Sequence, residues 1–185
     1  GGGDIHFTGS GNQYLYERNN TGRTLGDVVI NKSGGNCGWY DGGGAVYTFG
    51  SLDIKNGSWD CAESDGANSR NLTVTGNVIL GDNTGSANTA IFYGRVANIS
   101  FGNLYVDTDG KYDATGNTTT ISGYNASTNN AIYANGTIVH NSGTFAFTDS
   151  SNYSGIEIQI EGGAGSAGTY FHDVTFSGNS TYRFP

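Results

Sequence analysis

The sequence predicts an all-β fold, and within that class a β-solenoid, in which strands form a parallel β-helix or stacked β-arches. Three observations support this prediction: an internal repeat, apolar residues on alternate positions, and no window with helical apolar spacing. With 32 glycines, 12% aromatic residues and only 13% charged residues, the composition also differs from that of ordinary helical or α/β domains.

The internal repeat emerges when three similar tripeptides are aligned. Placing Ala45-Val46-Tyr47, Ala90-Ile91-Phe92 and Ala131-Ile132-Tyr133 in register also aligns the glycines Gly57, Gly102 and Gly143. A looser fourth copy ends at Phe184, and we interpret it as a terminal cap. The sequence therefore predicts about four repeats of roughly 35–45 residues, a length typical of solenoids and propellers.

Each copy contains short strands with one buried face. Around each aligned glycine the apolar residues occupy alternate positions, as Leu52 and Ile54 do before Gly57, which places their side chains on one side of a strand. A further apolar run precedes each copy, so a unit has three strands. A propeller blade needs four antiparallel strands, whereas a solenoid coil buries its inward residues against the coils above and below it. Three strands favour the solenoid.

We expect a single domain that spans residues 1–185, because this length allows one continuous core. Residues 1–26 have a weak apolar pattern and are expected to form an irregular first coil, or an arm that packs on a neighbouring molecule. Residues 27–184 hold the repeats.

The charge pattern argues against several classes of partner. The net charge is −8 and the eight Lys and Arg residues are scattered singly, so no basic stripe is available for a nucleic acid. No apolar run approaches the roughly 20 residues of a transmembrane helix. The chain lacks methionine and begins with three glycines, so we expect a mature chain whose signal peptide has been removed, or a fragment.

Cysteines and glycosylation sequons predict a secreted protein of the cell envelope. Cys37 and Cys61 are the only cysteines, and a disulfide between them would stabilise the fold by roughly 3 kcal/mol in the chain-entropy model. The alternative is two buried thiols, since Cys61 occupies an inward position. Ten asparagines lie in Asn-x-Ser/Thr, of which we expect only some to carry glycans: Asn19, Asn31, Asn56, Asn71, Asn98, Asn117, Asn125, Asn135, Asn152 and Asn179.

One acidic segment is a candidate metal site. Asp107, Asp109 and Asp113 surround Gly110, and the pattern resembles part of a calcium-binding loop, in which a glycine permits the sharp turn and carboxylates converge on the ion. The pattern lacks the glutamate and the flanking helices of an EF-hand. The alternative is an aspartate-rich turn between coils. Calcium is the only cofactor that the sequence indicates.

The sequence assigns no catalytic residue. A solenoid enzyme that cleaves polysaccharides needs carboxylates, with a nearby Arg or Lys, on one outward face. Arg95, close to the acidic segment that follows it, is the only such arrangement we find. We therefore do not predict an enzyme.

The repeats resemble those of known surface proteins. Gly43-Gly44-Ala45-Val46-Tyr47, Ala131-Ile132-Tyr133 and Phe176-Ser177-Gly178-Asn179 are similar to the GGAI and FxxN motifs of right-handed parallel β-helices. Such motifs occur in polymorphic-outer-membrane-protein repeats and in pectin-lyase-like adhesins of bacteria and methanogenic archaea. The resemblance implies a cell-surface β-helix and transfers no catalytic residue. A less specific resemblance is to archaeal sheath and surface-layer proteins, whose β-arch units associate into hoops or tubes.

These observations together predict a structural extracellular protein that self-assembles into a cell-surface sheath, filament or lattice. The ends of a solenoid expose strand edges, and edge prolines, lysines or a capping helix, which usually block such edges, are nearly absent here. One alternative is an adhesin or glycan-binding module whose outward tyrosines and tryptophans stack on sugars. Another is a polysaccharide-cleaving enzyme. An ice-binding surface would need a flat ladder of outward threonines, and Thr118-Thr119-Thr120 does not recur in the other copies.

Overall fold

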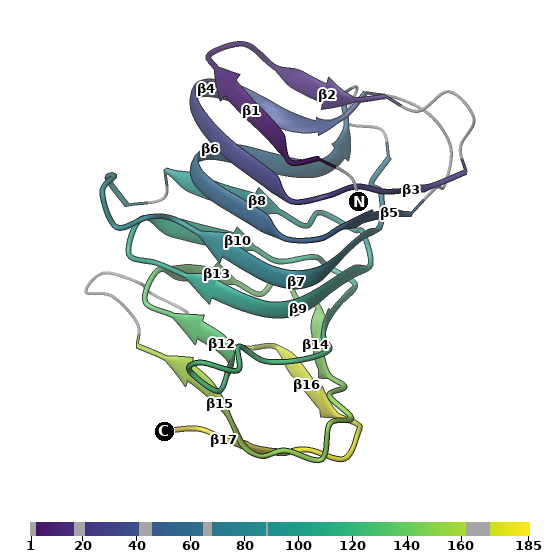
Figure 1. The fold of residues 1–185 in the computed structure, drawn as a ribbon, viewed down its shortest axis with the longest axis vertical. Coiled ribbons are helices and arrows are strands. Elements are labelled where there is room, and N and C mark those ends of the chain that lie inside the picture. The colour runs from purple at the N-terminus through teal and green to yellow at the C-terminus, as the bar shows by residue number, and fades with distance from the viewer. Residues whose placement is uncertain (1–2, 17–20, 41–45, 65–67, 88, 162–170) are drawn as a thin grey trace.

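The computed structural model describes residues 3–16, 21–40, 46–64, 68–87, 89–161 and 171–185. These residues form 17 β-strands and no helix, and every pairing between the strands is parallel. The chain coils from the N-terminus at one end of a stack to the C-terminus at the other (Figure 1). The predicted all-β class and β-solenoid are confirmed.

Each coil has three faces, here called A, B and C in chain order. Face A comprises β1 (Ile5–Gly9), the starts of β4 (Val28–Trp39) and β6 (Leu52–Glu63), the ends of β7 (Leu72–Leu80) and β9 (Ile99–Val106), β12 (Asn130–Ala134), β15 (Ser154–Ile160) and β17 (Thr181–Arg183). Face B comprises β2 (Gln13–Leu15), the ends of β4 and β6, β8 (Ala90–Tyr93), β10 (Gly110–Asp113) and β13 (Thr137–Val139). Face C comprises β3 (Arg23–Thr24), β5 (Tyr47–Phe49), the starts of β7 and β9, β11 (Thr118–Ile121), β14 (Thr144–Phe147) and β16 (Asp173–Phe176).

The true coil is shorter than the predicted repeat. On face A one inward column of paired residues runs through Ile5, Val28, Leu52, Val78, Leu104, Ile132 and Ile158. Successive members are 23 to 28 residues apart, so the stack has about six turns where the sequence predicted about four repeats. The three aligned tripeptides lie on different faces, because Tyr47 belongs to face C, Phe92 to face B and Ile132 to face A. The predicted repeat therefore extends over roughly five successive faces, whereas one coil has three faces.

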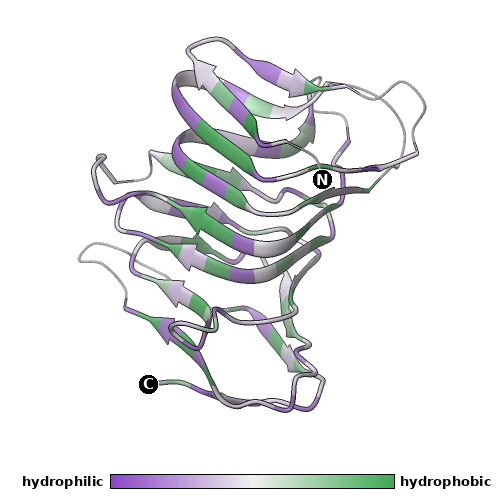
Figure 2. Cartoon of the chain, viewed as in Figure 1, coloured by the Kyte–Doolittle hydropathy of each residue, from purple (hydrophilic) through white to green (hydrophobic). Residues whose placement is uncertain are grey.

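The core forms a continuous column inside the stack. Along strands such as β7, β8 and β14 the buried residues alternate with partly exposed ones, which contributes to the striped pattern of Figure 2. Leu52, Ile54 and Trp59 are 0% exposed, as the alternation predicts. Burial of one such aliphatic side chain stabilises the fold by roughly 1.5–3 kcal/mol. Because each coil is covered by its neighbours, this burial ties the coils together.

Glycines are required at corners where adjacent coils approach closely. A Cβ atom at Gly110 would lie 2.1 Å from the backbone oxygen of Leu80, and one at Gly143 would lie 2.1 Å from that of Thr115. Neither backbone oxygen can turn away without a shift of its coil. Gly143, which the sequence alignment singled out, is thus explained by close packing at a corner.

Candidate functional site

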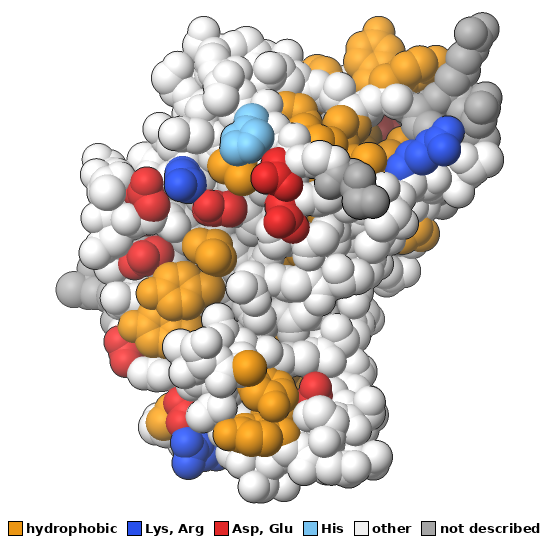
Figure 3. Space-filling view, in the orientation of Figure 1, with side chains coloured by type: hydrophobic (Ala, Val, Ile, Leu, Met, Phe, Trp, Pro, Cys, Tyr) orange, Lys and Arg blue, Asp and Glu red, His pale blue; other side chains and the backbone are white. Residues whose placement is uncertain are grey.

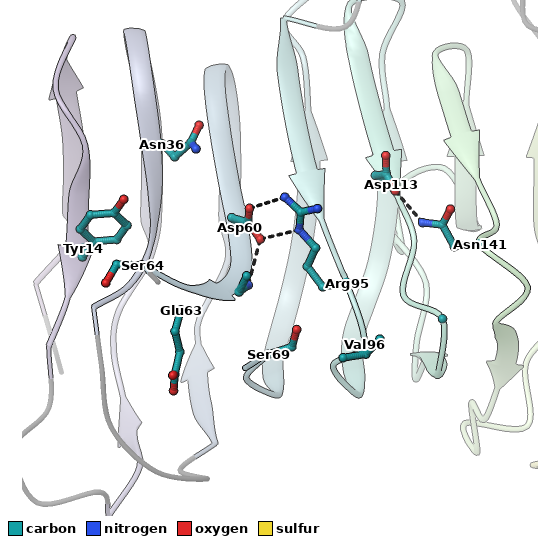
Figure 4. A pocket seen from close by; sticks show the side chains of 12 residues that line it. Tyr14, Asn36, Asp60, Glu63, Ser64, Ser69, Arg95, Val96, Asp113 and Asn141 are labelled. Carbon is teal, nitrogen blue, oxygen red and sulfur yellow. Dashed lines mark hydrogen bonds and ion pairs between the residues drawn. The ribbon is translucent and has the colours of Figure 1, made fainter. Parts of the chain in front are cut away.

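A groove runs along the outside of face B, across the direction of the strands. Its cavity volume is about 850 Å³, and it is lined by at least one residue from each of six successive coils. Six of these are Tyr14, Asn36, Asp60, Arg95, Asp113 and Asn141 (Figure 4). With parallel strands roughly 4.8 Å apart, six coils span about 24 Å. The groove is thus long enough for an extended ligand.

An ion pair between neighbouring coils lies at the centre of the groove. Arg95 donates from Nε to Oδ1 of Asp60 over 2.9 Å and from Nη2 to Oδ2 over 2.6 Å. These hydrogen bonds raise the pKa of Arg95 above its ordinary value, so the side chain stays cationic. The guanidinium also lies over the Tyr93 ring, 4.7 Å from its centroid.

Arg95 reaches this position through an unusual backbone. Its φ of 57° lies in the left-handed region, which non-glycine residues seldom adopt and which often marks a functional site. The backbone is held because Gly116 donates its N–H to the carbonyl oxygen of Arg95 over 2.7 Å. The Arg95 side chain is 48% exposed, which leaves part of its fork open to a ligand. The sequence predicted an outward Arg95, and its partner Asp60 was missed.

Three further polar pairs complete the groove. Lys111 Nζ lies 2.9 Å from Asp113 Oδ2, and Asn141 donates to Asp113 Oδ1 over 2.5 Å. Near one end, Glu63 makes a buried ion pair with Arg70 at 2.7 Å. Each carboxylate in the described lining is therefore already engaged by a cation. Such a surface offers hydrogen-bond donors and acceptors to a polar ligand such as a saccharide.

The structure does not bring the three predicted calcium ligands together. Asp109 is 1% exposed and accepts N–H groups from Asn83 at 3.1 Å and Gly85 at 3.0 Å, so it caps a loop of the preceding coil. Asp107 accepts the N–H of Thr108, while Asp113 belongs to the groove. Within the described ranges, no group of three or more His, Cys, Asp and Glu side chains converges on one point. The carboxylates serve loop and groove geometry, as in the alternative of an aspartate-rich turn.

The hydrogen bonds that Asp109 accepts predict that the stability of the fold depends on pH. Burial alone would raise the pKa of Asp109, but the N–H donors of Gly85 and Asn83 outweigh it and hold the pKa below its usual value. The carboxylate thus stabilises the fold above about pH 4, and this contribution is lost as the pH falls through the lower pKa of the folded state. Asp109→Asn should cost about 1–3 kcal/mol at pH 7.

The measurement is urea unfolding of both proteins between pH 7 and pH 2. The difference between wild type and Asp109→Asn should shrink as the carboxyl is protonated. A difference that stays constant over this range would show that the hydrogen bonds to the carboxylate are not its source.

The two cysteines lie inside face B as free, buried thiols. Cys37 is paired in register with Trp59, so Cys61 lies two residues further along the neighbouring strand. That offset separates Cα atoms by roughly 8 Å on parallel strands, so a disulfide would need a backbone shift. Burial raises the pKa of Cys37 to about 11 and that of Cys61 still further, which makes both thiols unreactive. The predicted disulfide stays a prediction.

The described glycosylation sequons gather at the corners between faces. Asn31 and Asn56 are paired neighbours at the corner between faces A and B. Six of the sequon asparagines are exposed, namely Asn31, Asn56, Asn98, Asn117, Asn152 and Asn179. Three are half-buried, namely Asn71, Asn125 and Asn135, and Asn19 lies outside the described residues. Their occupancy stays a prediction.

The C-terminal end of the stack leaves core positions uncovered. Val174 pairs with Phe145 and Phe176 with Phe147, so both continue inward columns. Phe145 and Phe147 are at most 1% exposed, whereas Val174 is 36% and Phe176 is 50% exposed. The predicted cap thus leaves these two apolar side chains exposed, and Figure 3 shows an apolar patch on the near face of the C-terminal coils.

The described part of the chain has no helix that is long and apolar enough to cross a membrane. No protein-family model, curated protein or solved structure matches the chain.

Proposed function

We propose that the protein is a structural component of an extracellular surface and that copies associate end to end through their solenoid stacks. The observation that carries this proposal is the last described rung of face C, where Val174 and Phe176 continue inward core columns but are 36% and 50% exposed. Exposed apolar side chains next to unpaired strand edges favour the addition of another rung. A second copy supplies such a rung at its first coil, and the contact can repeat into a fibre because it is heterologous.

The first test replaces an apolar side chain at the open end. Phe176→Asp should abolish concentration-dependent association, because a carboxylate buried in the contact would lose its hydration. Sedimentation velocity and negative-stain electron microscopy at increasing concentration measure this. Phe184→Asp is a second test, because Phe184 is 62% exposed and its replacement should disturb the fold less than that of Phe176. It should also reduce association.

The matched control is Val96→Asp, which changes an exposed apolar residue at the groove, away from the ends of the stack. This variant should associate like wild type. A wild-type protein that stays monomeric at high concentration, or equal losses in Val96→Asp and Phe176→Asp, would contradict the end-to-end contact.

Binding of an extended glycan in the groove is a second function that one observation favours. The groove crosses six coils, and Arg95 at its centre keeps part of its guanidinium exposed. An oligosaccharide could lie along the stack, accept hydrogen bonds from Arg95 and donate one to the amide oxygen of Asn141, with Tyr14 offering a ring near one end.

Arg95→Ala tests this second function. Loss of hydrogen bonds from a charged donor costs about 1.5–3 kcal/mol, so affinity for an oligosaccharide selected on a glycan array should fall roughly tenfold to hundredfold. Lys55→Ala removes the same charge from a side chain outside the groove and should keep the affinity. If no glycan binds to the folded wild type, the groove has another role.

A further inference from the structure

Face C carries an outward column of hydroxyl side chains over seven successive rungs. The pairings connect, in order, Thr24, Thr48, Thr73, Ser100, Thr120, Ala146 and Thr175. Every position but one bears a hydroxyl group. The strands β3, β5 and β14 mark this side of the stack in Figure 1. The predicted repeats did not reveal this ladder of threonines, but the strand pairings of the true coils show it.

The alternation along each strand makes these hydroxyls point outward. In β5 the flanking Tyr47 and Phe49 are buried, and in β7 the flanking Leu72 and Val74 are buried, so Thr48 and Thr73 face away from the core. Within face C no register shift interrupts the column, whereas faces A and B contain bulges. The array is thus regular along the stack.

A second column extends the array along the strand direction. Thr118 is paired with Thr144 and lies two residues before Thr120, so its side chain projects from the same face. Rungs are roughly 4.8 Å apart, and alternate residues of a strand are roughly 6.7 Å apart. Hydroxyl and methyl groups therefore repeat along the stack, and two neighbouring rungs carry a second threonine beside the first column.

The face is uncharged and its central hydroxyls are available. From β5 to β14 the outward positions carry threonine, serine, alanine or asparagine and no charged residue. Among the contacts of the described residues, the hydroxyls of Thr48, Thr73, Ser100 and Thr120 have no hydrogen-bond partner. They are free to bond to a ligand, and no charge has to be stripped of water when the face is covered.

A ligand that uses the whole array must itself repeat at the spacing of the rungs. A small soluble molecule touches only a few rungs, and an irregular protein surface cannot match hydroxyls at a fixed spacing. Crystalline water presents donors and acceptors on a regular lattice, and ordered waters bond well to hydroxyl groups. We infer that face C binds ice, with the threonine hydroxyls occupying water positions of the crystal surface and the methyl groups lying between them. This inference is independent of association at the stack ends.

The inference also requires that two of the sequons carry no glycan. Asn71 and Asn98 stand at the edge of face C, each two residues before a member of the column. A glycan on either asparagine would cover the array, so both must be unoccupied in an ice-binding form. The test therefore uses the full chain produced without glycosylation.

The experiment measures thermal hysteresis and the fraction of protein retained in slowly grown ice. Wild type should show both, and Thr73→Tyr and Thr120→Tyr should lose most of both, because a bulky ring lifts the face from the crystal. Thr137→Tyr is the matched control, since Thr137 is an outward threonine of β13 on face B. It should behave like wild type. Circular dichroism and melting curves establish that the variants are folded.

Several outcomes would overturn the inference. One is exclusion of the folded wild type from ice at all concentrations, and another is a loss of activity in Thr137→Tyr as large as that in Thr120→Tyr. If wild type bound microcrystalline cellulose instead and Thr120→Tyr did not, the lattice would be that of a polysaccharide. If the face C variants changed only the mass measured by light scattering, the face would be a contact between copies.

Discussion

Trp59→Ala should lower the free energy of unfolding by about 3–5 kcal/mol, the largest effect expected for any single core residue. The Trp59 side chain is fully buried, and its ring makes edge contacts with Trp39 at 4.8 Å and Phe49 at 5.2 Å between centroids. A third contact, at 6.2 Å, reaches Phe7 in the first coil. Removing the ring leaves a cavity that three coils share, and a solenoid whose coils depend on their neighbours cannot confine the damage to one.

Urea unfolding followed by circular dichroism measures the loss. Trp59→Phe is the control, because a ring at this position keeps the contacts with Trp39 and Phe49 and should cost clearly less than alanine. A cost below about 1 kcal/mol for Trp59→Ala would mean that the first coils do not share a common core.

The inward residues could be predicted from the sequence because alternation is a local property of a strand. Leu52 and Ile54 were both expected to face inward, and both are 0% exposed. Neither coil length nor the neighbours in the stack has to be known for this step. The glycine turns could be predicted for the same reason, because a corner is recognised from the glycine and polar residues within it.

The arrangement of coils could not be predicted because it depends on the length of each turn. Coils of 23 to 28 residues vary too much for one period to stand out, and strands of similar composition recur on all three faces. Alignment of similar strands therefore matched face C with face B and face A. Asp60 and Arg95 are 35 residues apart in the sequence and meet only because they lie on adjacent coils. The groove could therefore not be predicted from the sequence. The hydroxyl column of face C was hidden by the same error.

The acidic segment shows a different limit. Asp107, Asp109 and Asp113 all occupy odd positions, which would place them on one face of a regular strand. However, β9 ends at Val106 and β10 begins at Gly110, so Asp107 and Asp109 lie in the turn, where strand alternation does not set their directions. Gly81 has a φ of 95° and leaves room where a Cβ atom would lie 2.1 Å from Asp109 Oδ1. Asp109 enters this space and binds the loop. The residue that determines the position of Asp109 is therefore Gly81 of the preceding coil. A short sequence motif around Asp109 does not include it.

Glu63→Ala should lower the free energy of unfolding by about 3–5 kcal/mol, because it breaks the buried ion pair between Glu63 and Arg70. Both side chains are at most 7% exposed, and Arg70 Nη2 lies 2.7 Å from Glu63 Oε1. Asn68 donates to the second carboxylate oxygen over 3.1 Å, and Arg70 donates its backbone N–H to the carbonyl oxygen of Cys61. The pair thus joins the end of β6 to the residues that lead into β7.

The double variant Glu63→Leu with Arg70→Leu separates the cost of an unpaired charge from the value of the pair itself. Replacement of a buried ion pair by apolar side chains of similar volume is often close to neutral, so the double variant should be more stable than Glu63→Ala. Urea unfolding of wild type, Glu63→Leu, Arg70→Leu and the double variant closes the cycle and measures the coupling. Because Glu63 also borders the groove, any oligosaccharide affinity should fall in Glu63→Ala and recover with the stability in the double variant. If the double variant proved as unstable as Glu63→Ala, the loss would come from packing or from Asn68, and the ion pair would not be what holds this corner of the groove in place.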